Sequence, residues 1–206
     1  MKKKLFVFLI VSGLLATTIT QAQGPVFGVK GGLTLSNLYA SEVDSKNGRI
    51  GFNLGVLGRT DPEKPIGLQL ELLYTTKGET FTYDGLFIDQ EFKLNLSYVD
   101  LPVMLAVRAG EALEFHGGLY AGLLLSSNLS SSGDLGTSSD DLDKDNFNTL
   151  DYGLVGGVAF NAGAVQVGAR YNYGLSKLAS SDEAEFILGD AKNSYAQLYV
   201  AFGFGQ

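Results

Sequence analysis

The fold is decided by a segment in which every second side chain is apolar: Ile66-Gly-Leu-Gln-Leu-Glu-Leu-Leu-Tyr-Thr75. Its even-numbered residues are all apolar, whereas the odd-numbered ones include Gly67, Gln69 and Glu71. Alternation with a period of two predicts a β-strand that has one apolar and one polar face, rather than a helix.

The same alternation returns along the whole chain, and no segment keeps a helical period. It predicts eight strands, at about 25–38, 49–59, 66–77, 92–108, 114–126, 150–160, 164–176 and 194–204. In the fourth segment the apolar side chains change from even to odd positions between Tyr98 and Val99. A change of face is what a β-bulge produces, so we expect a bulge beside Pro102.

The connections between these strands alternate in length, with 10, 6, 14, 5, 23, 3 and 17 residues. An even number of strands with short turns at one end and long loops at the other is typical of bacterial outer-membrane barrels. The four long connections together carry a net charge of −11. We therefore expect acidic extracellular loops and two periplasmic termini.

The first 22 residues have the three parts of a secretory signal peptide. Three lysines, Lys2 to Lys4, precede an apolar run over 5–16, and Ala22 follows as a small residue at the cleavage site. The run is too short to span a bilayer as a helix. We expect cleavage after Ala22, which leaves 23–206 as one outer-membrane barrel domain.

Composition excludes several kinds of function. The chain has no Cys and one His, so disulfide frameworks and Cys or His-rich metal sites are excluded. A net charge of −7 argues against a nucleic-acid-binding protein. No cofactor motif is present in the sequence, and we expect no cofactor.

The apolar faces could meet lipid or could surround a ligand, as in a soluble lipocalin-like binder. The polar faces here are sparse and rich in glycine, unlike a solvated surface, and the apolar faces are long enough for a membrane band. The predicted fold is therefore an all-β, eight-stranded, antiparallel, up-and-down transmembrane barrel with a polar lumen filled by side chains.

Several charged residues fall on the polar faces and should form a network in this lumen: Lys30, Arg49, Glu71, Lys93, Asp100, His116 and Arg170. An unpaired buried ion costs several kcal/mol. We therefore expect Glu71 and Asp100 to contact Arg49, Arg170 or Lys93. His116 lacks a nucleophile at a suitable position, so we interpret it as a hydrogen-bonded structural residue rather than a general base.

An acidic cluster in the longest loop contains Asp140, Asp141, Asp143 and Asp145. The spacing of the last three matches the start of an EF-hand loop, but Asn146 stands where glycine is required and Tyr152 where a bidentate glutamate is required. A solvated acidic loop is the favoured interpretation, with weak divalent-cation binding as the alternative.

Five blocks of the chain resemble the PorT-like, porin-family outer-membrane barrels of Bacteroidota. They are Phe27-Gly-Val-Lys-Gly-Gly-Leu-Thr-Leu-Ser-Asn37, Leu73-Tyr-Thr-Thr-Lys-Gly78, Leu96-Ser-Tyr-Val-Asp-Leu-Pro-Val103, Ala169-Arg-Tyr-Asn-Tyr-Gly-Leu175 and Gln197-Leu-Tyr-Val-Ala-Phe-Gly-Phe204. The resemblance implies an outer-membrane barrel of undefined substrate. Nothing in these residues matches a secretion-specific site.

These observations together predict a non-enzymatic structural or interaction protein of the outer membrane. A narrow passive channel for small solutes or cations is the alternative, and an outer-membrane hydrolase is a further one. The expected partners are outer-membrane lipid and lipopolysaccharide, the barrel-insertion machinery, and a protein partner at the extracellular loops.

Overall fold

The computed structural model describes residues 26–39, 48–60, 64–84, 89–133, 138–141, 147–180 and 191–204. The expected signal peptide, residues 1–22, lies outside these residues. The described segments contain no apolar helix of membrane-spanning length.

These residues form nine strands. They are β1 (Val26–Tyr39), β2 (Arg49–Arg59), β3 (Ile66–Asp84), β4 (Asp89–Ala109), β5 (Leu113–Gly133), β6 (Ser138–Asp141), β7 (Leu150–Ala162), β8 (Val165–Lys177) and β9 (Lys192–Phe204). Eight of them coincide with the eight predicted segments, which confirms the prediction. The short β6 falls within the predicted long loop and was not expected.

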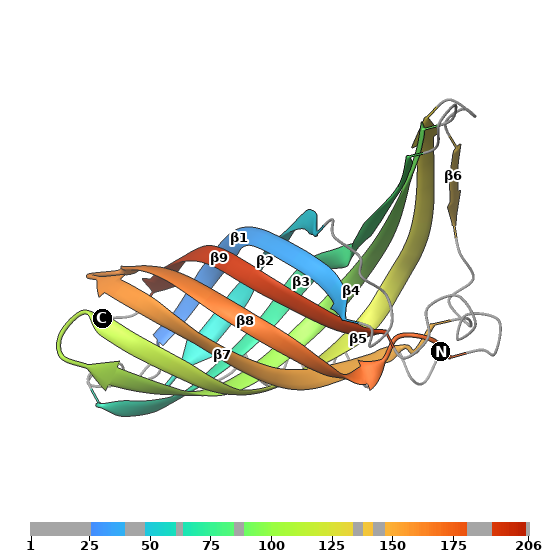
Figure 1. Cartoon of the computed structure of the whole chain (residues 1–206). Coiled ribbons are helices and arrows are strands. Elements are labelled where there is room, and N and C mark those ends of the chain that lie inside the picture. Colours follow the sequence, from blue (N-terminus) through green and yellow to red (C-terminus); the bar gives the residue numbers. More distant parts are fainter. Residues whose placement is uncertain are drawn as a thin grey trace.

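The eight long strands close into a barrel (Figure 1). Each strand pairs antiparallel with its neighbours in the chain order, β9 pairs with β1, and β4 pairs with β5. β6 is not part of the ring, because it pairs with β5 only over 128–131. Closure leaves no free strand edge within the ring, which is what a sheet in lipid requires.

The two ends of the barrel differ. At one end, here called the turn end, the connections are short, and Gly110 and Gly163 have φ values of 76° and 61°, a left-handed conformation that suits glycine in tight turns. The first residue of β1 and the last of β9 also lie at this end. The opposite end, here called the loop end, holds the long connections.

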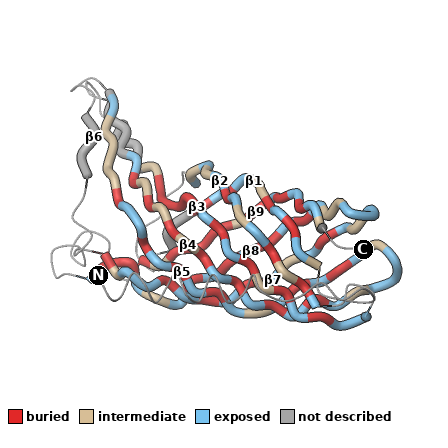
Figure 2. The backbone as a smooth tube through the Cα atoms, turned by 180° about the vertical axis from the view of Figure 1, so that it is seen from behind, coloured by how far each residue is buried: buried red, intermediate tan, exposed pale blue. Residues whose placement is uncertain are grey.

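The apolar faces of the strands are exposed. Buried and exposed residues alternate along the strands of the barrel (Figure 2). Leu68 is 47% exposed and Val167 is 54% exposed, although both belong to strongly apolar strands. In the same strands Glu71 and Arg170 are buried. A soluble lipocalin-like binder would need the reverse arrangement, so the orientation predicted for a membrane barrel is confirmed.

The predicted change of face on β4 is wrong, and the bulge lies near Tyr98 rather than beside Pro102. On β4 the even-numbered side chains stay buried from Leu94 to Ala106, so this strand never changes face. The shift in pairing lies between Ser97 and Tyr98, and the additional residue is Leu125 on the partner strand β5. Near the loop end the apolar residues of β4 have even numbers, because their side chains fill the lumen. Further along the strand they have odd numbers, because their side chains face outward.

Three strands continue past the ring at the loop end. The ends of β3, β4 and β5 rise together from the barrel, with β6 beside β5 (Figure 1). The predicted loop over 78–91 is therefore mostly a hairpin, since pairing continues to Asp84 and Asp89. Among the described residues, no strand pairs with 80–84 of β3 on the side away from β4.

Candidate functional site

The middle of the lumen holds one carboxylate between two cations. Lys30 on β1 donates to Glu71 on β3 over 3.0 Å, and Arg170 on β8 donates to both oxygens of the same carboxylate over 2.8 and 2.9 Å. Gln69 adds a hydrogen bond of 2.6 Å to Oε1. The side chains of the three ions are inaccessible to solvent. This cluster carries a net charge of +1 and ties three strands together across the barrel.

An aromatic ring lies against both cations of this cluster. The ring centroid of Tyr199 is 3.8 Å from Lys30 Nζ and 5.1 Å from Arg170 Cζ. Cations over the face of a desolvated aromatic ring gain about 2 kcal/mol. Tyr199 therefore partly offsets the second positive charge that Glu71 cannot neutralise.

A second ionic cluster lies closer to the loop end. Lys77 Nζ donates to Asp100 Oδ1 over 2.9 Å and to Asp151 Oδ2 over 3.1 Å. The Tyr195 hydroxyl donates to Asp100 Oδ2 over 3.0 Å, and the Asn193 amide donates to Asp151 Oδ2 over 3.1 Å. This cluster has a net charge of −1, the opposite sign to the middle one.

The ammonium group of Lys77 is also surrounded by aromatic rings. The ring centroids lie 4.4 Å (Tyr98), 5.1 Å (Tyr120) and 4.4 Å (Tyr195) from Nζ. Three rings and two carboxylates form a site suited to an ammonium cation. Here the protein's own lysine fills it, and the lysine thereby blocks this level of the lumen.

At the turn end, Glu114 collects a third group of polar side chains. It forms a buried salt bridge with Arg59, and its Oε1 lies 2.6 Å from His116 Nε2 and 3.3 Å from Gln166 Nε2. The other ring nitrogen of His116 lies 3.4 Å from the Tyr199 hydroxyl. His116 is thus held on both sides and buried, an arrangement that suits a structural residue.

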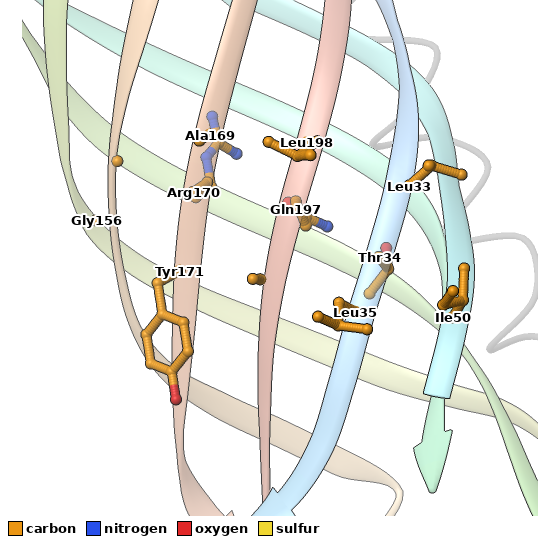
Figure 3. A pocket seen from close by; sticks show the side chains of 12 residues that line it. Leu33, Thr34, Leu35, Ile50, Gly156, Ala169, Arg170, Tyr171, Gln197 and Leu198 are labelled. Atoms are coloured by element: carbon orange, nitrogen blue, oxygen red, sulfur yellow. The ribbon is translucent and has the colours of Figure 1, made fainter. Parts of the chain in front are cut away.

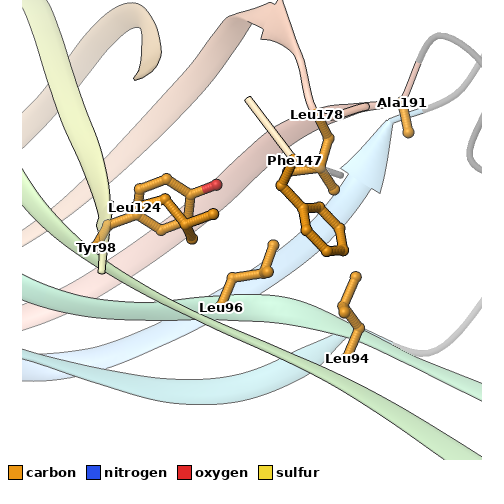
Figure 4. Packing of buried hydrophobic residues seen from close by; sticks show 7 residues of the cluster. All are labelled: Leu94, Leu96, Tyr98, Leu124, Phe147, Leu178 and Ala191. Carbon is orange, nitrogen blue, oxygen red and sulfur yellow. The ribbon is translucent and has the colours of Figure 1, made fainter. Parts of the chain in front are cut away.

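An apolar cluster closes the lumen at the loop end (Figure 4). It is formed by Leu94, Leu96, Tyr98, Leu124, Phe147, Leu178 and Ala191. The Phe147 ring lies between Leu178 and the two leucines of β4. Backbone hydrogen bonds hold this cap in place: Asn148 donates to Leu178 over 2.9 Å, and Leu178 donates to Ala191 over 2.8 Å.

A further concavity lies on the outward face and not in the lumen (Figure 3). This apolar groove has a volume of about 640 Å³ and crosses β1, β2, β7, β8 and β9. It forms where small residues such as Gly156, Ala169 and Ala196 lie between larger ones such as Leu35 and Leu198. Its outward-facing lining is apolar apart from the hydroxyl of Tyr171, so it lacks the convergent polar groups that a catalytic site needs.

The structure brings together most of the residues that the sequence places in the lumen. Lys30, Glu71, Asp100, His116 and Arg170 are buried in it, and the expected contact between Glu71 and Arg170 is present.

Two predicted lumen residues do not join the expected network, although Arg49 shares the inward-facing side of β2 with Asn53 and Leu57. Arg49 is half-buried near the loop end, where Nη1 donates to the Lys77 carbonyl over 2.9 Å, and it does not reach Asp100. Lys93 is exposed, because β4 keeps its even-numbered residues inside. The partner of Asp100 is instead Lys77, which the sequence analysis missed. Continuing the polar face of Gln69 and Glu71 to position 77 would have found it.

The acidic cluster considered for cation binding falls in the longest connection. Asp143 and Asp145 lie outside the described residues, as do the side chains of Asp140 and Asp141. Within the part of the chain that is described, no group of three or more His, Asp or Glu side chains is arranged to hold a metal ion.

Comparison with known proteins agrees with this architecture. The family described as outer membrane protein beta-barrel domain matches residues 21–180. No curated protein matches the chain.

Two solved structures share the fold. Ail, the attachment invasion locus protein of Yersinia pestis, in complex with the heparin analogue sucrose octasulfate, has a TM-score of 0.51 and 20% identity, over 88% of this chain and 99% of that one. Neisserial surface protein A has a TM-score of 0.50 and 17% identity, over 88% and 99%. With a closed eight-stranded barrel, an apolar outer face and a family match over most of its length, the chain belongs to the outer membrane protein β-barrel domain family.

Proposed function

We propose that this protein is a closed, non-enzymatic barrel of the outer membrane that presents its loop end to a partner. The observation that carries the proposal is the filled lumen. Two ionic clusters and an apolar cap follow one another from the middle of the barrel to the loop end.

Each layer opposes conduction for its own reason. Passage of a hydrated ion through the cap requires wetting of packed leucine and phenylalanine side chains. Passage through the next level requires displacement of the Lys77 ammonium group from Asp100 and Asp151, which would leave buried charges unpaired. Breaking a buried ion pair costs about 3–5 kcal/mol. These barriers favour a structural or interaction role over a narrow passive channel.

The same arrangement argues against hydrolysis. His116 is buried between Glu114 and Tyr199, far from the loop end. Cleavage of a peptide or of lipid A by the purified protein, abolished by His116→Ala, would overturn the non-enzymatic assignment.

The orientation in the membrane follows from the two ends. We place the turn end and both termini in the periplasm and the loop end outside, because short periplasmic turns and long outer loops are usual in such barrels. Residues 1–22 would direct export and be removed, and 23–206 would be inserted by the barrel-insertion machinery. The sequence blocks quoted above favour the PorT-like, porin-family barrels of Bacteroidota.

The loop end offers the partner surface. The sheet of β3, β4, β5 and β6 rises beyond the ring, and its edge at 80–84 is free among the described residues. A free edge can accept an extended segment by β-strand addition. The four segments that the sequence predicted as long loops, including the hairpin of β3 and β4, carry a charge of −11. A basic protein segment therefore fits this surface, as does lipopolysaccharide bridged by divalent cations.

The acidity of these loops argues against the kind of ligand that was crystallised with the structural neighbour Ail. Ail was crystallised with a heparin analogue, sucrose octasulfate. A polysulfated ligand would be repelled by acidic loops. We therefore do not assign a sulfated-polysaccharide ligand to this chain.

Planar-bilayer recording of the refolded protein tests the closed state. We expect no stepwise conductance from the wild-type chain. Stepwise, cation-selective openings would overturn the proposal and support the channel.

Cysteine labelling tests the orientation, since the chain has no native cysteine. Ser132 is exposed at the loop end and Glu111 is exposed in the turn that joins β4 to β5. A membrane-impermeant maleimide should label Ser132→Cys on intact cells and Glu111→Cys only after the outer membrane is opened. The reverse result would invert the assignment of the two ends.

A further inference from the structure

A small cavity lies inside the mouth of the barrel at the turn end. Its volume is about 110 Å³, which is enough for several water molecules or one tetrahedral oxyanion. Two arginines line it, Arg59 from the end of β2 and Arg108 from the end of β4. Gly163 and Ala164 form part of its rim and are exposed, so a solute can reach the cavity from the turn end.

Arg59, which lines this cavity, has unused hydrogen-bond donors. Its side chain is 94% buried, and Nη1 is paired with the carboxylate of Glu114. Nε and Nη2 are also buried, and neither has a protein partner among the described residues. These two nitrogens form one edge of the guanidinium group, with their N–H bonds nearly parallel. That edge matches two oxygens of a phosphate or carboxylate group.

Arg108 contributes a third donor. Its Nε is buried and has no protein partner in the described part of the chain. Leaving such a donor unsatisfied costs about 1–3 kcal/mol, and more when the group is charged. Three donors of this kind on two side chains that line one cavity point to a ligand that can satisfy them together.

The charge around the cavity favours an anion. Two arginines face one carboxylate, Glu114, and that carboxylate is shared with His116 and Gln166. The amide of Gln166 is further occupied by Asn161, over 2.9 Å. Among the residues that the structure describes, Glu114 Oε2 makes no hydrogen bond either, but it already forms the salt bridge with Arg59, so the unused donors are those of the guanidinium groups. Two arginines against one glutamate give this region a net positive charge.

We propose that this cavity binds an oxyanion of the phosphate class, held by the Nε and Nη2 edge of Arg59 and by Arg108. The phosphate group could belong to free inorganic phosphate or to a phospholipid headgroup of the inner leaflet, which lies beside this mouth if the turn end is periplasmic. The site does not depend on whether the lumen conducts, and it is separate from the acidic loop end.

Calorimetric titration with inorganic phosphate tests the proposal in two settings. The first uses the full chain in a maltoside detergent, which carries no phosphate, and there we expect saturable binding. The second uses phospholipid nanodiscs. Binding in both settings identifies free phosphate as the ligand, whereas binding in detergent alone identifies the lipid headgroup as the occupant. Lack of binding in detergent overturns the proposal.

Three variants make the test specific. Arg108→Gln should weaken phosphate binding by at least about tenfold, since it removes a charged hydrogen-bond donor. Arg59→Gln should abolish binding, but it also releases Glu114 and could impair folding, so the Arg108 variant carries the test. Lys64→Gln is the control, because Lys64 is exposed near the same end, carries the same charge and does not line the cavity. An equal loss in Lys64→Gln would show a general charge effect and overturn the site.

Discussion

The sharpest test of the filled lumen is the substitution Glu71→Gln. Gln has nearly the shape of Glu, so the change removes a charge without opening a cavity. Glu71 is the only carboxylate within reach of two inaccessible cations, Lys30 and Arg170, in the described part of the chain. The variant leaves both cations buried without a counter-ion.

The expected cost follows from these contacts. Removing one partner of a buried ion pair costs about 3–5 kcal/mol. Glu71 accepts three charge-assisted hydrogen bonds, at 3.0, 2.8 and 2.9 Å, and Gln can replace only part of them because it has a single acceptor oxygen. Glu71→Gln should therefore lower the free energy of unfolding by an amount at the upper end of this range, about 5 kcal/mol. Adding Lys30→Met to Glu71→Gln removes one stranded cation and should recover about 2 kcal/mol of this loss.

The free energy of unfolding can be measured by urea titration of the protein refolded in phospholipid vesicles. The chain has no Trp, so circular dichroism and the shift of the folded barrel on gels replace Trp fluorescence. Glu111→Gln is the matched control, since Glu111 is exposed and its substitution should change stability by less than about 0.5 kcal/mol. If Glu71→Gln falls within about 1 kcal/mol of this control, the lumen network does not hold the barrel together and our reasoning fails.

Three further predictions use the same unfolding measurement. Lys77→Met strands two buried aspartates and should cost about 3–5 kcal/mol, whereas Lys93→Met, on an exposed lysine, should be close to neutral. Gly118→Ala should destabilise by about 1–3 kcal/mol, because the added Cβ would clash with the backbone oxygen of Val103 on β4. Gly117→Ala is the control and should be tolerated, because its Cβ would meet nothing within 4 Å. Equal effects of the two substitutions would contradict this packing. Leu119→Arg, midway along the outward face of β5, should cost about 2–4 kcal/mol in vesicles, and a neutral result would mean that this face does not meet lipid.

The strands could be predicted from the sequence because lipid and lumen impose opposite requirements on neighbouring residues. Leu68 and Gln69 alternate for this reason, and so do Val167 and Gly168. Period-two patterning therefore located every strand of the ring and assigned their faces, except for the part of β4 near the loop end. It could not locate β6, whose residues Ser138–Asp141 are polar throughout and have no apolar face to mark them.

The pattern failed where apolar residues enter the lumen. Leu94 and Leu96 belong to the cap, so an apolar residue near the loop end does not identify the outward face. The assumption that every apolar residue faces outward predicted a change of face on β4, which the strand does not have. The same assumption placed Lys93 in the lumen. The cap itself depends on Phe147 and Leu178, which lie in connections and whose approach to β4 no local pattern encodes.

Strand register and ion pairing differ in how strongly the physics determines them. A slip of one residue would turn a whole strand over and move Lys30, Glu71 or Arg170 into lipid, at about 2–4 kcal/mol for each basic residue near mid-depth, while drawing leucines into the lumen. Many residues of a strand therefore favour the same orientation of its two faces, so the faces can be predicted from the sequence. Exchange of Asp100 between Lys77 and another lysine changes only which of two similar ion pairs forms, and that choice depends on side-chain reach inside the closed barrel. The lumen charges taken together therefore determine which face of each strand points inward. Which cation pairs with which carboxylate can be read only from the packed structure.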